Sequence, residues 1–533
     1  MPENPEHREP EHDPRPAPVL LGEEPLRIEQ LVAVARQGAP VELGPAARER
    51  IRASRAVIEG LAADTRPHYG VSTGFGALAK VSIPAAKRAR LQRGLVLSHA
   101  AGTGPEVERE LVRALMLLRL NTLASGRTGV REQVAELYAG VLNAGITPVV
   151  HEYGSLGCSG DLSPLAHCAI VLIGAGEARD RSGERMPARR ALERAGLEPV
   201  ELREKEGLAL INGTDGMLGS LALAIHDLER LLRVADIAAA ASVEALLGSD
   251  AVFAEDLHEL RPHPGQLRSA ANLRRVLDGS TLLSNRAQGG FARVQDAYSL
   301  RCSPQVHGAV RDTLAHAAGV AGIELRSAID NPVVTPDGRV ESNGNFHGAP
   351  IAYVLDFLAI AVADAASISE RRCDRFLDVA RSHGLPPFLA ADPGVDSGLM
   401  IAQYSAAGIV SELKRLAVPS SVDSIPSSAM QEDHVSMGWA GARKLRRAID
   451  GLARVLSIEL LTAVRALDFR MRDAELAGRR PAAATRAVHE LVRGHVPPPS
   501  SDEWLSPEIE AVHGLVERGE LREAVERVVG PLA

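Results

Sequence analysis

Hydrophobic side chains recur along most of the chain at the 3.6-residue spacing of an α-helix. The clearest runs cover residues 107–126, 217–249, 308–330 and 435–469, and we expect each run to form a long helix. Within the second run, ADIAAAASVEALL is apolar on nearly every face, so it requires burial by other helices or other subunits. Alternating strand patterns are scarce, and only short pieces such as NPVV and GRVESNG fit them. The chain is therefore predicted to be mainly α.

The longest apolar run, residues 349–366, contains Asp356 and Asp364. Ionised carboxylates are costly inside a bilayer, so we expect a buried helix and no membrane span. Residues 1–20 are rich in Pro and Glu and lack the apolar core of a signal peptide. This composition predicts a disordered tail on a cytoplasmic protein.

The segment VPPPSSDEWLSPEIEAV, residues 496–512, has the composition of a linker followed by a capped helix. Ser506 has the side chain of an N-cap, and Pro507 suits the first helical position. We therefore expect a small helical appendage over residues 476–533.

The chain has 533 residues, of which 45% are hydrophobic and 24% are charged, and its net charge is −8 at pH 7. An acidic body repels nucleic acids and anionic membranes, so neither is expected as a partner. Only 3% of the residues are aromatic, and packing between helices must rest on Ala, Leu and Val. The four cysteines show no CxxC spacing, and a chain of this length has core enough to fold without disulfides.

Glycine is concentrated in YGSLGCSGDLSPLAH, residues 153–167, just before an apolar helix expected to begin near Asp161. One interpretation is a tight loop whose glycines satisfy unusual dihedral angles. A phosphate-binding P-loop does not fit, because no strand precedes the segment and no Gly-Lys-Ser/Thr follows it. A nucleophile elbow does not fit either, because the frame around Ser159 is one residue short of Gly-x-Ser-x-Gly.

A third interpretation makes the backbone itself the reagent. The amide nitrogen of Gly160 can attack the carbonyl carbon of Cys158, because glycine leaves that nitrogen unhindered. Loss of water from the new ring and from Ser159 gives 4-methylidene-imidazol-5-one (MIO), an electrophile that a helix N-terminus near Asp161 would strengthen. Side chains offer no comparable electrophile, which is why enzymes recruit cofactors for such chemistry. The motif alone leaves the loop and the ring interpretations open.

Gln295, Tyr298 and Arg301 recur at a spacing of three residues in VQDAYSLRCSP. On a helix ended by Pro304, this spacing places all three within about a third of the circumference. The planar fork of Arg301 suits a substrate carboxylate, which it can bind with two hydrogen bonds. A surface arginine on an amphipathic helix is the alternative.

The neighbouring side chains Glu432, Asp433 and His434 in QEDHV invite a metal-site interpretation. Adjacent side chains diverge on any regular element, and the chain contains no HExxH motif. We therefore expect no metal.

The segment GSLGCSGDLSPLAH resembles the prosthetic-group motif of the aromatic amino acid ammonia-lyases, commonly Gly-Ser-x-Gly-Ala-Ser-Gly-Asp-Leu-x-Pro-Leu. The resemblance extends over roughly residues 20–510, through the ordered blocks YGVSTGFG, LVLSHAAGTG, LALINGT, VQDAYSLRCSPQVHG, DNPVV, NGNFHG and SVDSIPSSAMQEDHVSMG. It implies a carbon–nitrogen lyase that acts on an amino acid with an MIO group formed from Cys158, Ser159 and Gly160, and no external cofactor.

The resemblance also implies an architecture. The expected fold is a long, near-parallel helical bundle of the ammonia-lyase/fumarase type. A smaller N-terminal lobe over residues 21–210 carries the MIO loop and the catalytic tyrosine loop, and the central bundle covers residues 211–475. The implied assembly is a homotetramer in which three chains build each active site.

The resemblance further assigns catalytic and binding roles. Tyr69 matches the catalytic tyrosine of the family, and its ordinary pKa of about 10 has to be lowered for work as a base at neutral pH. Tyr298 is implied to lie beside the electrophile, Gln295 to help place the substrate, and Asn212 to hydrogen-bond near the ring and the carboxylate. Phe346 is implied to pack near the substrate.

The blocks SHAAG and QEDHVSMG resemble the histidine-specific members of the family, which convert L-histidine to trans-urocanate and ammonia in the first step of histidine degradation. His99 and Glu432 are the corresponding selectivity residues, and Glu432 is also placed in the catalytic set, because a polar pair can hold an imidazole ring.

Three positions depart from that pattern: Cys158 replaces the usual Ala, Met430 stands where Asn is common, and Asp215 stands where Gln is frequent. Tyrosine or phenylalanine ammonia-lyase and aromatic 2,3-aminomutase activity therefore stay open, as does a non-catalytic helical assembly protein.

Overall fold

The computed structural model of the chain describes residues 16–64, 68, 70–74, 81–284 and 294–533. The chain forms two compact units. Unit 1 comprises Met1–Leu223, Ala321–Ala349 and Asp423–Trp439, and unit 2 comprises Ala224–Val320, Pro350–Val422 and Ala440–Ala533. Both units are discontinuous along the chain, whereas the boundaries expected from the sequence are continuous, and those boundaries stay predictions.

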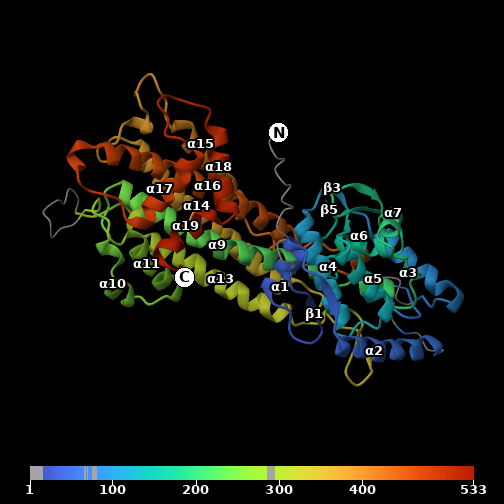
Figure 1. Cartoon of the computed structure of the whole chain (residues 1–533). Helices are drawn as coiled ribbons and strands as arrows, with labels where there is room; N and C mark the ends of the chain where they lie inside the picture. Colours follow the sequence, from blue (N-terminus) through green and yellow to red (C-terminus); the bar gives the residue numbers. More distant parts are fainter. Residues whose placement is uncertain (1–15, 65–67, 69, 75–80, 285–293) are drawn as a thin grey trace, which may run out of the picture. The chain divides into compact units, whose positions relative to one another are not determined.

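Helices make up most of the described chain, which confirms the mainly α class (Figure 1). The first unit contains α1 (Ile28–Val32), α2 (Pro45–Ala63), α3 (Ala85–His99), α4 (Arg109–Ala124), α5 (Glu132–Asn143), α6 (Leu162–Leu172), α7 (Ala188–Arg194), α8 (Glu206–Ile211) and the start of α9 (Asp215–Ala245). Helix α4 is buried along almost its whole length. Helices α3, α6 and α8 pack against one another, and α6 begins directly after Asp161, as expected.

The strands of unit 1 are short and form separate small sheets. Strands β1 (Val19–Leu21) and β2 (Val41–Leu43) are parallel, β3 (Thr103–Glu106) and β5 (His151–Tyr153) are antiparallel, and β4 (Thr147–Pro148), β6 (Glu177–Arg179) and β7 (Arg185–Pro187) form an antiparallel sheet. Antiparallel strands β8 (Val333–Val334) and β9 (Val340–Glu341) pair Val334 with Val340. This last pair confirms the strand prediction for NPVV and GRVESNG.

Strand β1 begins at Val19, inside the segment that we predicted as a tail. Residues 1–15 of that segment lie outside the described residues. The tail therefore ends before Val19, because the side chain of this residue is buried against the rest of unit 1.

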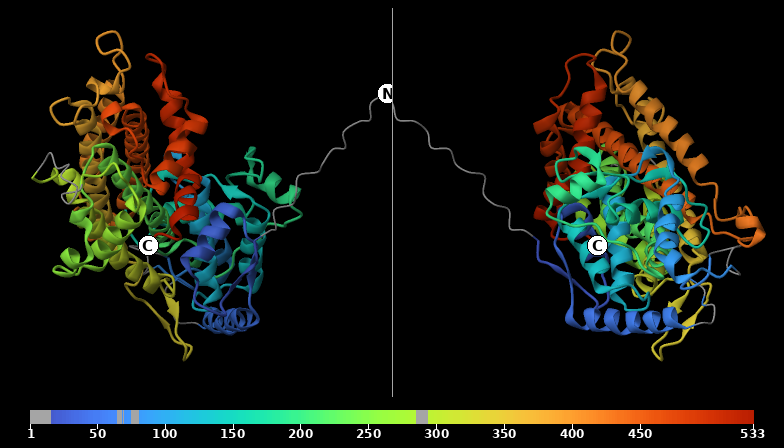
Figure 2. Two further views of the ribbon diagram at one scale, coloured as in Figure 1. Left: turned by 60° about the vertical axis from the view of Figure 1, so that its left-hand side comes forward. Right: turned by 90° about the vertical axis from the view of Figure 1, so that its right-hand side faces the viewer.

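Among its described residues, unit 2 contains helices joined by loops and no β-strand. It contains the rest of α9, then α10 (Glu255–Glu259), α11 (Pro264–Leu277), α12 (Tyr298–Arg301), α13 (Ser303–Glu324), α14 (Ala349–Leu377), α15 (Met400–Leu416), α16 (Gly438–Arg472), α17 (Ala483–His495), α18 (Leu505–Glu517) and α19 (Glu520–Val529). The four long runs predicted from the sequence correspond to α4, α9, α13 and α16. Figure 2 shows the long helices of this unit from two further sides.

A buried acidic group connects three long helices of unit 2. Glu459 of α16 accepts hydrogen bonds from Ser242 Oγ of α9 at 2.7 Å and from Ser369 Oγ of α14 at 2.5 Å. Arg372 of α14 donates to the same carboxylate at 2.5 and 2.8 Å. All four side chains are fully buried, so the charge of Glu459 is compensated inside the helical core.

Helix α14 contains the long apolar run. Among the described helices it alone has the length and apolar composition of a membrane span. Its side chains are largely buried inside the protein, as expected for a core helix. Asp356 of this helix pairs with Lys444 Nζ at 2.7 Å and accepts from Ser421 N–H at 2.7 Å.

Two local predictions are wrong. Helix α18 begins at Leu505, so Ser506 lies within the first turn and caps nothing. Gln295 lies outside α12, and Pro304 is the second residue of α13 instead of the end of a preceding helix. Proline is tolerated in the first helical turn, because its missing N–H has no intrahelical acceptor there.

Candidate active site

The Cys-Ser-Gly triplet lies in a tight turn between β5 and α6. Ser159 has a φ of 48°, and Gly157 and Gly160 have φ values of 84° and 80°. A positive φ is uncommon for any residue with a side chain. Gly157 and Gly160 pair with each other across the turn, so the backbone folds back on itself at Ser159.

The position after Ser159 accepts only glycine. A Cβ at residue 160 would lie 1.9 Å from the carbonyl oxygen of Gly213. The next residue, Asp161, donates its N–H to the same oxygen at 2.7 Å. The turn and the missing Cβ together leave the Gly160 nitrogen unhindered, so the triplet fits an MIO group.

Asp161 connects the turn to the helices around it. Its Oδ1 accepts from Ser155 Oγ at 3.0 Å, and its Oδ2 accepts from Met217 N–H at 2.9 Å. Complete burial raises the pKa of this carboxyl to about 7, although these donors oppose the shift. Asp161 therefore joins the start of α6 to the start of α9.

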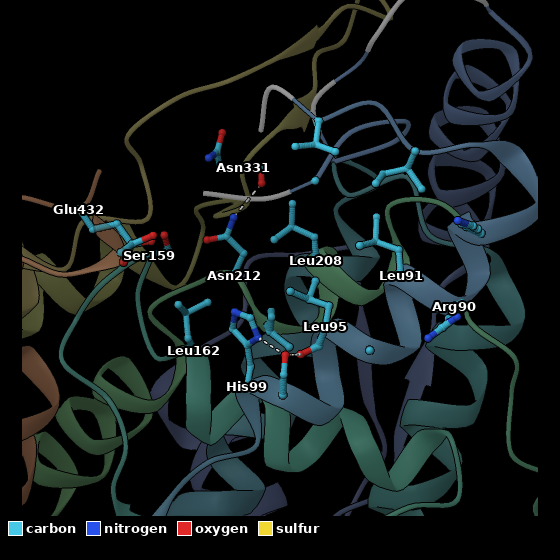
Figure 3. A pocket seen from close by; sticks show the side chains of 18 residues that line it. Arg90, Leu91, Leu95, His99, Ser159, Leu162, Leu208, Asn212, Asn331 and Glu432 are labelled. Carbon is cyan, nitrogen blue, oxygen red and sulfur yellow. Dashed lines mark hydrogen bonds between the residues drawn. The ribbon is translucent and has the colours of Figure 1, made fainter. Parts of the chain in front are cut away.

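Ser159 opens into a pocket of about 780 Å³ in unit 1, a size that suits a small-molecule ligand. Its described lining combines apolar walls with a few polar groups (Figure 3). The polar and charged lining residues are Lys87, Arg90, Ser98, His99, Ser159, Asn212, Asn331, Ser428 and Glu432. Three predicted site residues, His99, Asn212 and Glu432, thus share one cavity with Ser159.

His99 is the last residue of α3 and lines the pocket. Ser98 Oγ donates its hydrogen to Leu95 O at 3.1 Å and lies 3.1 Å from His99 Nδ1. Either atom can be the donor in the second contact, because the role of each ring nitrogen depends on the tautomer. Burial lowers the pKa of His99, although Leu95 O and Glu432 favour the protonated form. His99 therefore presents an imidazole ring with a lowered pKa to the pocket.

Glu432 is held at the end of a left-handed turn. Three successive residues, Ser428, Ala429 and Met430, have φ values of 51°, 52° and 70°. Ser427 N–H donates to Glu432 O at 2.9 Å, and Ser427 Oγ donates to Glu432 Oε2 at 3.0 Å. The carboxylate therefore has a fixed partner next to the pocket.

The acidic and imidazole groups of QEDHV have separate partners. Glu432 binds Ser427, whereas His434 stacks on His347 with ring centroids 5.6 Å apart and an interplanar angle of 6°. Within the described ranges, no three His, Cys, Asp or Glu side chains gather as metal ligands.

Asn212 presents an unpaired acceptor next to the pocket. Its Nδ2 donates to Asn331 O at 2.8 Å. Its Oδ1 is buried and has no hydrogen-bond partner among the described residues. A buried polar atom is normally paired, so this oxygen fits a donor group of a bound molecule.

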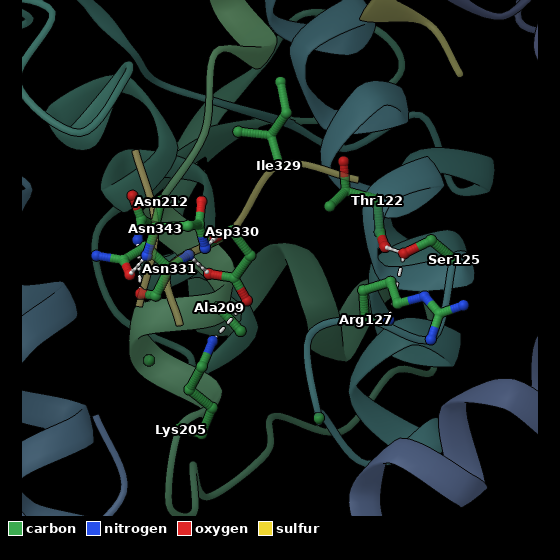
Figure 4. Close-up of polar contacts among 12 residues, drawn as sticks. Thr122, Ser125, Arg127, Lys205, Ala209, Asn212, Ile329, Asp330, Asn331 and Asn343 are labelled. Carbon is green, nitrogen blue, oxygen red and sulfur yellow. Dashed lines mark hydrogen bonds and ion pairs between the residues drawn. The ribbon is translucent and has the colours of Figure 1, made fainter. Parts of the chain in front are cut away.

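A buried ion pair supports the segment that holds Asn212. Lys205 Nζ lies 2.5 Å from Asp330 Oδ2, and Asp330 Oδ1 accepts the N–H of Asn331 at 2.8 Å. Figure 4 shows this chain of contacts from Lys205 to Asn212. Burial lowers the pKa of Lys205 and raises that of Asp330, while each charge favours the ionised form of the other.

The remaining predicted site residues are not among the lining residues of the pocket. Tyr69 lies outside the described residues. Gln295, Tyr298 and Arg301 belong to unit 2, where Arg301 lies over the Tyr298 ring at 4.7 Å from its centroid. Phe346 is half-buried in unit 1, in the loop that follows β9.

The structure adds site residues that the sequence analysis missed. Asn331, Lys205 and Asp330 support Asn212, and Ser427 binds Glu432. The segment DNPVV was predicted as a strand and as a matching block, with no role for its Asp or Asn. No local signal distinguishes Ser427 from the serine that follows it, since its partners are set by the fold.

The chain is similar to known proteins over nearly its whole length. The family model for aromatic amino acid lyases matches residues 26–494. Histidine ammonia-lyase of Streptomyces griseus is 62% identical over 516 residues, covering 97% of this chain and 99% of that protein. Histidine ammonia-lyase of Anaeromyxobacter dehalogenans is 50% identical over 94% of this chain and 99% of that protein.

Solved structures show the same fold. Tyrosine aminomutase of Streptomyces globisporus is 39% identical, with a TM-score of 0.91 over 97% of this chain and 100% of that one. Histidine ammonia-lyase of Trypanosoma cruzi is 38% identical, with a TM-score of 0.87 over 96% of both chains. The chain therefore belongs to the aromatic amino acid lyase family.

Proposed function

We propose that the chain is a carbon–nitrogen lyase that converts L-histidine to trans-urocanate and ammonia, the first step of histidine degradation. The observation that carries the proposal is that Ser159, His99 and Glu432 line the same pocket in unit 1. The 62% identity to a histidine ammonia-lyase over nearly the whole chain supports it.

The Cys158-Ser159-Gly160 turn is the proposed source of an MIO group. The Gly160 nitrogen bonds to the Cys158 carbonyl carbon, and that carbonyl oxygen leaves as water with the hydrogens of the Gly160 and Ser159 amides. A second water takes the Ser159 hydroxyl and its Cα hydrogen. Once formed, the ring supplies the strong electrophile that assists loss of the substrate's α-amino group.

The polar residues of the pocket are proposed to hold the substrate. His99 provides a ring nitrogen and Glu432 a carboxylate on the pocket wall, and these two groups are proposed to pair with the polar nitrogens of the substrate's imidazole ring. A ring without an N–H would leave these polar groups unpaired, which is the basis of discrimination. Asn212 Oδ1 is an acceptor for the substrate's ammonium, and Tyr69 remains the proposed base for the β-proton.

The test is an assay with separate amino acids. We expect histidine to give urocanate, while tyrosine and phenylalanine give little coumarate or cinnamate. Formation of a β-amino acid from tyrosine would instead establish the second candidate function, an aromatic 2,3-aminomutase. This candidate is retained because the chain is 39% identical to a tyrosine aminomutase of known structure.

The proposed assembly is a cytoplasmic homotetramer in which neighbouring copies contribute Gln295, Tyr298, Arg301 and Phe346 to each site. Its support is the exposure of large side chains on the described surface of unit 2. Tyr298 is 71% exposed, and Tyr353, Phe357 and Ile360 form an exposed stripe on α14. Apolar patches of this kind mark protein–protein interfaces.

Arg301→Ala is expected to raise KM for histidine by about 10- to 100-fold, because a bidentate charge-assisted bond to the substrate carboxylate is lost. Arg301→Lys should recover part of this loss, since it restores the charge without the fork. Steady-state kinetics at fixed enzyme concentration measure both variants. An unchanged KM in Arg301→Ala excludes the carboxylate role.

A further inference from the structure

Cys158, Ser427 and Glu432 form a continuous hydrogen-bonded chain in unit 1, although 269 residues separate the first two in the sequence. Cys158 Sγ lies 3.1 Å from Ser427 Oγ. Ser427 Oγ in turn donates to Glu432 Oε2 at 3.0 Å. Because Cys158 precedes the reactive serine and Glu432 lines the pocket, these contacts join the ring-forming turn to the wall that faces the substrate.

The direction of both hydrogen bonds follows from the single hydrogen of the Ser427 hydroxyl. Ser427 uses that hydrogen on the Glu432 carboxylate, so at Cys158 its oxygen accepts and the thiol S–H donates. Burial raises the pKa of the Cys158 thiol, and the charge of Glu432 raises it as well, while Ser427 partly opposes the shift. The thiol therefore keeps its proton at neutral pH and remains a donor.

The backbone brings Ser427 and Glu432 together without orienting the carboxylate. Ser427 N–H donates to Glu432 O at 2.9 Å, and Glu432 N–H donates to Ser427 O at 3.3 Å. These bonds leave the side-chain torsions of Glu432 to their usual rotamers. The Ser427 hydroxyl selects one of them, and the thiol of Cys158 fixes where that hydroxyl points.

We propose that Cys158 is a positioning residue for Glu432, acting through Ser427. The Ser427 hydroxyl holds Oε2 of Glu432, and the Cys158 thiol holds that hydroxyl, so the two contacts fix a carboxylate that lines the pocket. The thiol takes no part in ring closure, which uses only the carbonyl carbon of Cys158 and leaves its side chain outside the ring. The inference rests on the proposed function, because Glu432 is proposed there to bind the substrate ring.

The experiment measures binding without turnover. In a Ser159→Ala background, isothermal titration calorimetry gives the Kd of L-histidine for each variant. Cys158→Ala and Ser427→Ala are each expected to raise this Kd by about 3- to 10-fold, the usual effect of one lost hydrogen bond. Cys158→Ser keeps a donor and should bind as tightly as the parent. The Cys158→Ala/Ser427→Ala double variant should be no weaker than Ser427→Ala, since both changes break one chain of contacts.

Cys168→Ala is the matched control, because it removes a buried thiol of the same unit in α6, and its Kd should equal that of the parent. Circular dichroism melting checks that every variant folds. If Cys158→Ala does not fold, the Kd values of Ser427→Ala and Cys158→Ser can still be compared with that of the parent. In the enzyme that retains Ser159, the same changes should raise KM while the intact mass shows a closed ring.

An unchanged Kd in Cys158→Ala, or additive effects in the double variant, would overturn the positioning role. Failure of the proposed function is seen separately, because the parent enzyme would then make no urocanate from histidine. The binding series would in that case use the amino acid that the parent does convert.

Discussion

Ser159→Ala should lower turnover by at least about 10³-fold, because it removes the hydroxyl whose loss completes the electrophile and no side chain can substitute for it. The fold should be retained, since the change removes one oxygen from a turn that Gly157 and Gly160 already form. Intact-mass spectrometry gives the direct readout. The parent chain should be lighter than its sequence mass by two water molecules, and the variant should show no second loss of water.

Ser163→Ala is the matched control for Ser159→Ala. Ser163 lies four residues further along, in α6, and its buried Oγ has no hydrogen-bond partner among the described residues. This variant should keep full activity and still lose two waters. If the parent chain is active on histidine and has its full sequence mass, no MIO ring has formed. That result would contradict the proposed ring and would favour the interpretation of residues 153–167 as a simple loop.

Lys205→Met should destabilise unit 1 by about 3–5 kcal/mol, because it leaves the Asp330 carboxylate buried without its partner. Both side chains are fully buried, and their charged groups lie 2.5 Å apart. The change should also reduce activity, since Asp330 orients Asn331 and Asn331 holds Asn212. Thermal unfolding followed by circular dichroism, together with kcat for histidine, measures both effects.

The Lys205→Met/Asp330→Leu double variant should recover most of the lost stability, because apolar groups of similar volume can replace a buried ion pair. Lys414→Met is the control, since Lys414 is exposed on α15, and it should change stability by less than about 0.5 kcal/mol. If Lys205→Met has the same melting temperature as the parent, Asp330 is uncharged or is paired by another group.

The prediction of the helices was accurate where periodicity extends over many turns and weak where it depends on a single cap. Helices α4, α9, α13 and α16 lie within or across the predicted runs. Ser506 and Gln295 were misplaced because a helix boundary depends on where packing turns the backbone, which local residue preferences do not determine.

The residues of the candidate site divide in the same way. Motif blocks identified His99, Ser159, Asn212 and Glu432, which the structure gathers around one pocket. The supporting residues were not predictable, because an ordinary Ser, Lys or Asp gains its role only from a partner far away in the chain.

The sequence by itself determined the helical class and the glycine-flanked Cys158-Ser159-Gly160 triplet. Both are local properties. Helical periodicity depends on residues that are close together in the sequence, and an unhindered backbone nitrogen after Ser159 requires only a glycine at position 160. The tertiary structure decided which polar groups meet Ser159 and Glu432. Hydrogen bonds such as that of Cys158 with Ser427 join segments 269 residues apart, and a bond of about 3 Å between such segments exists only after the whole unit has packed.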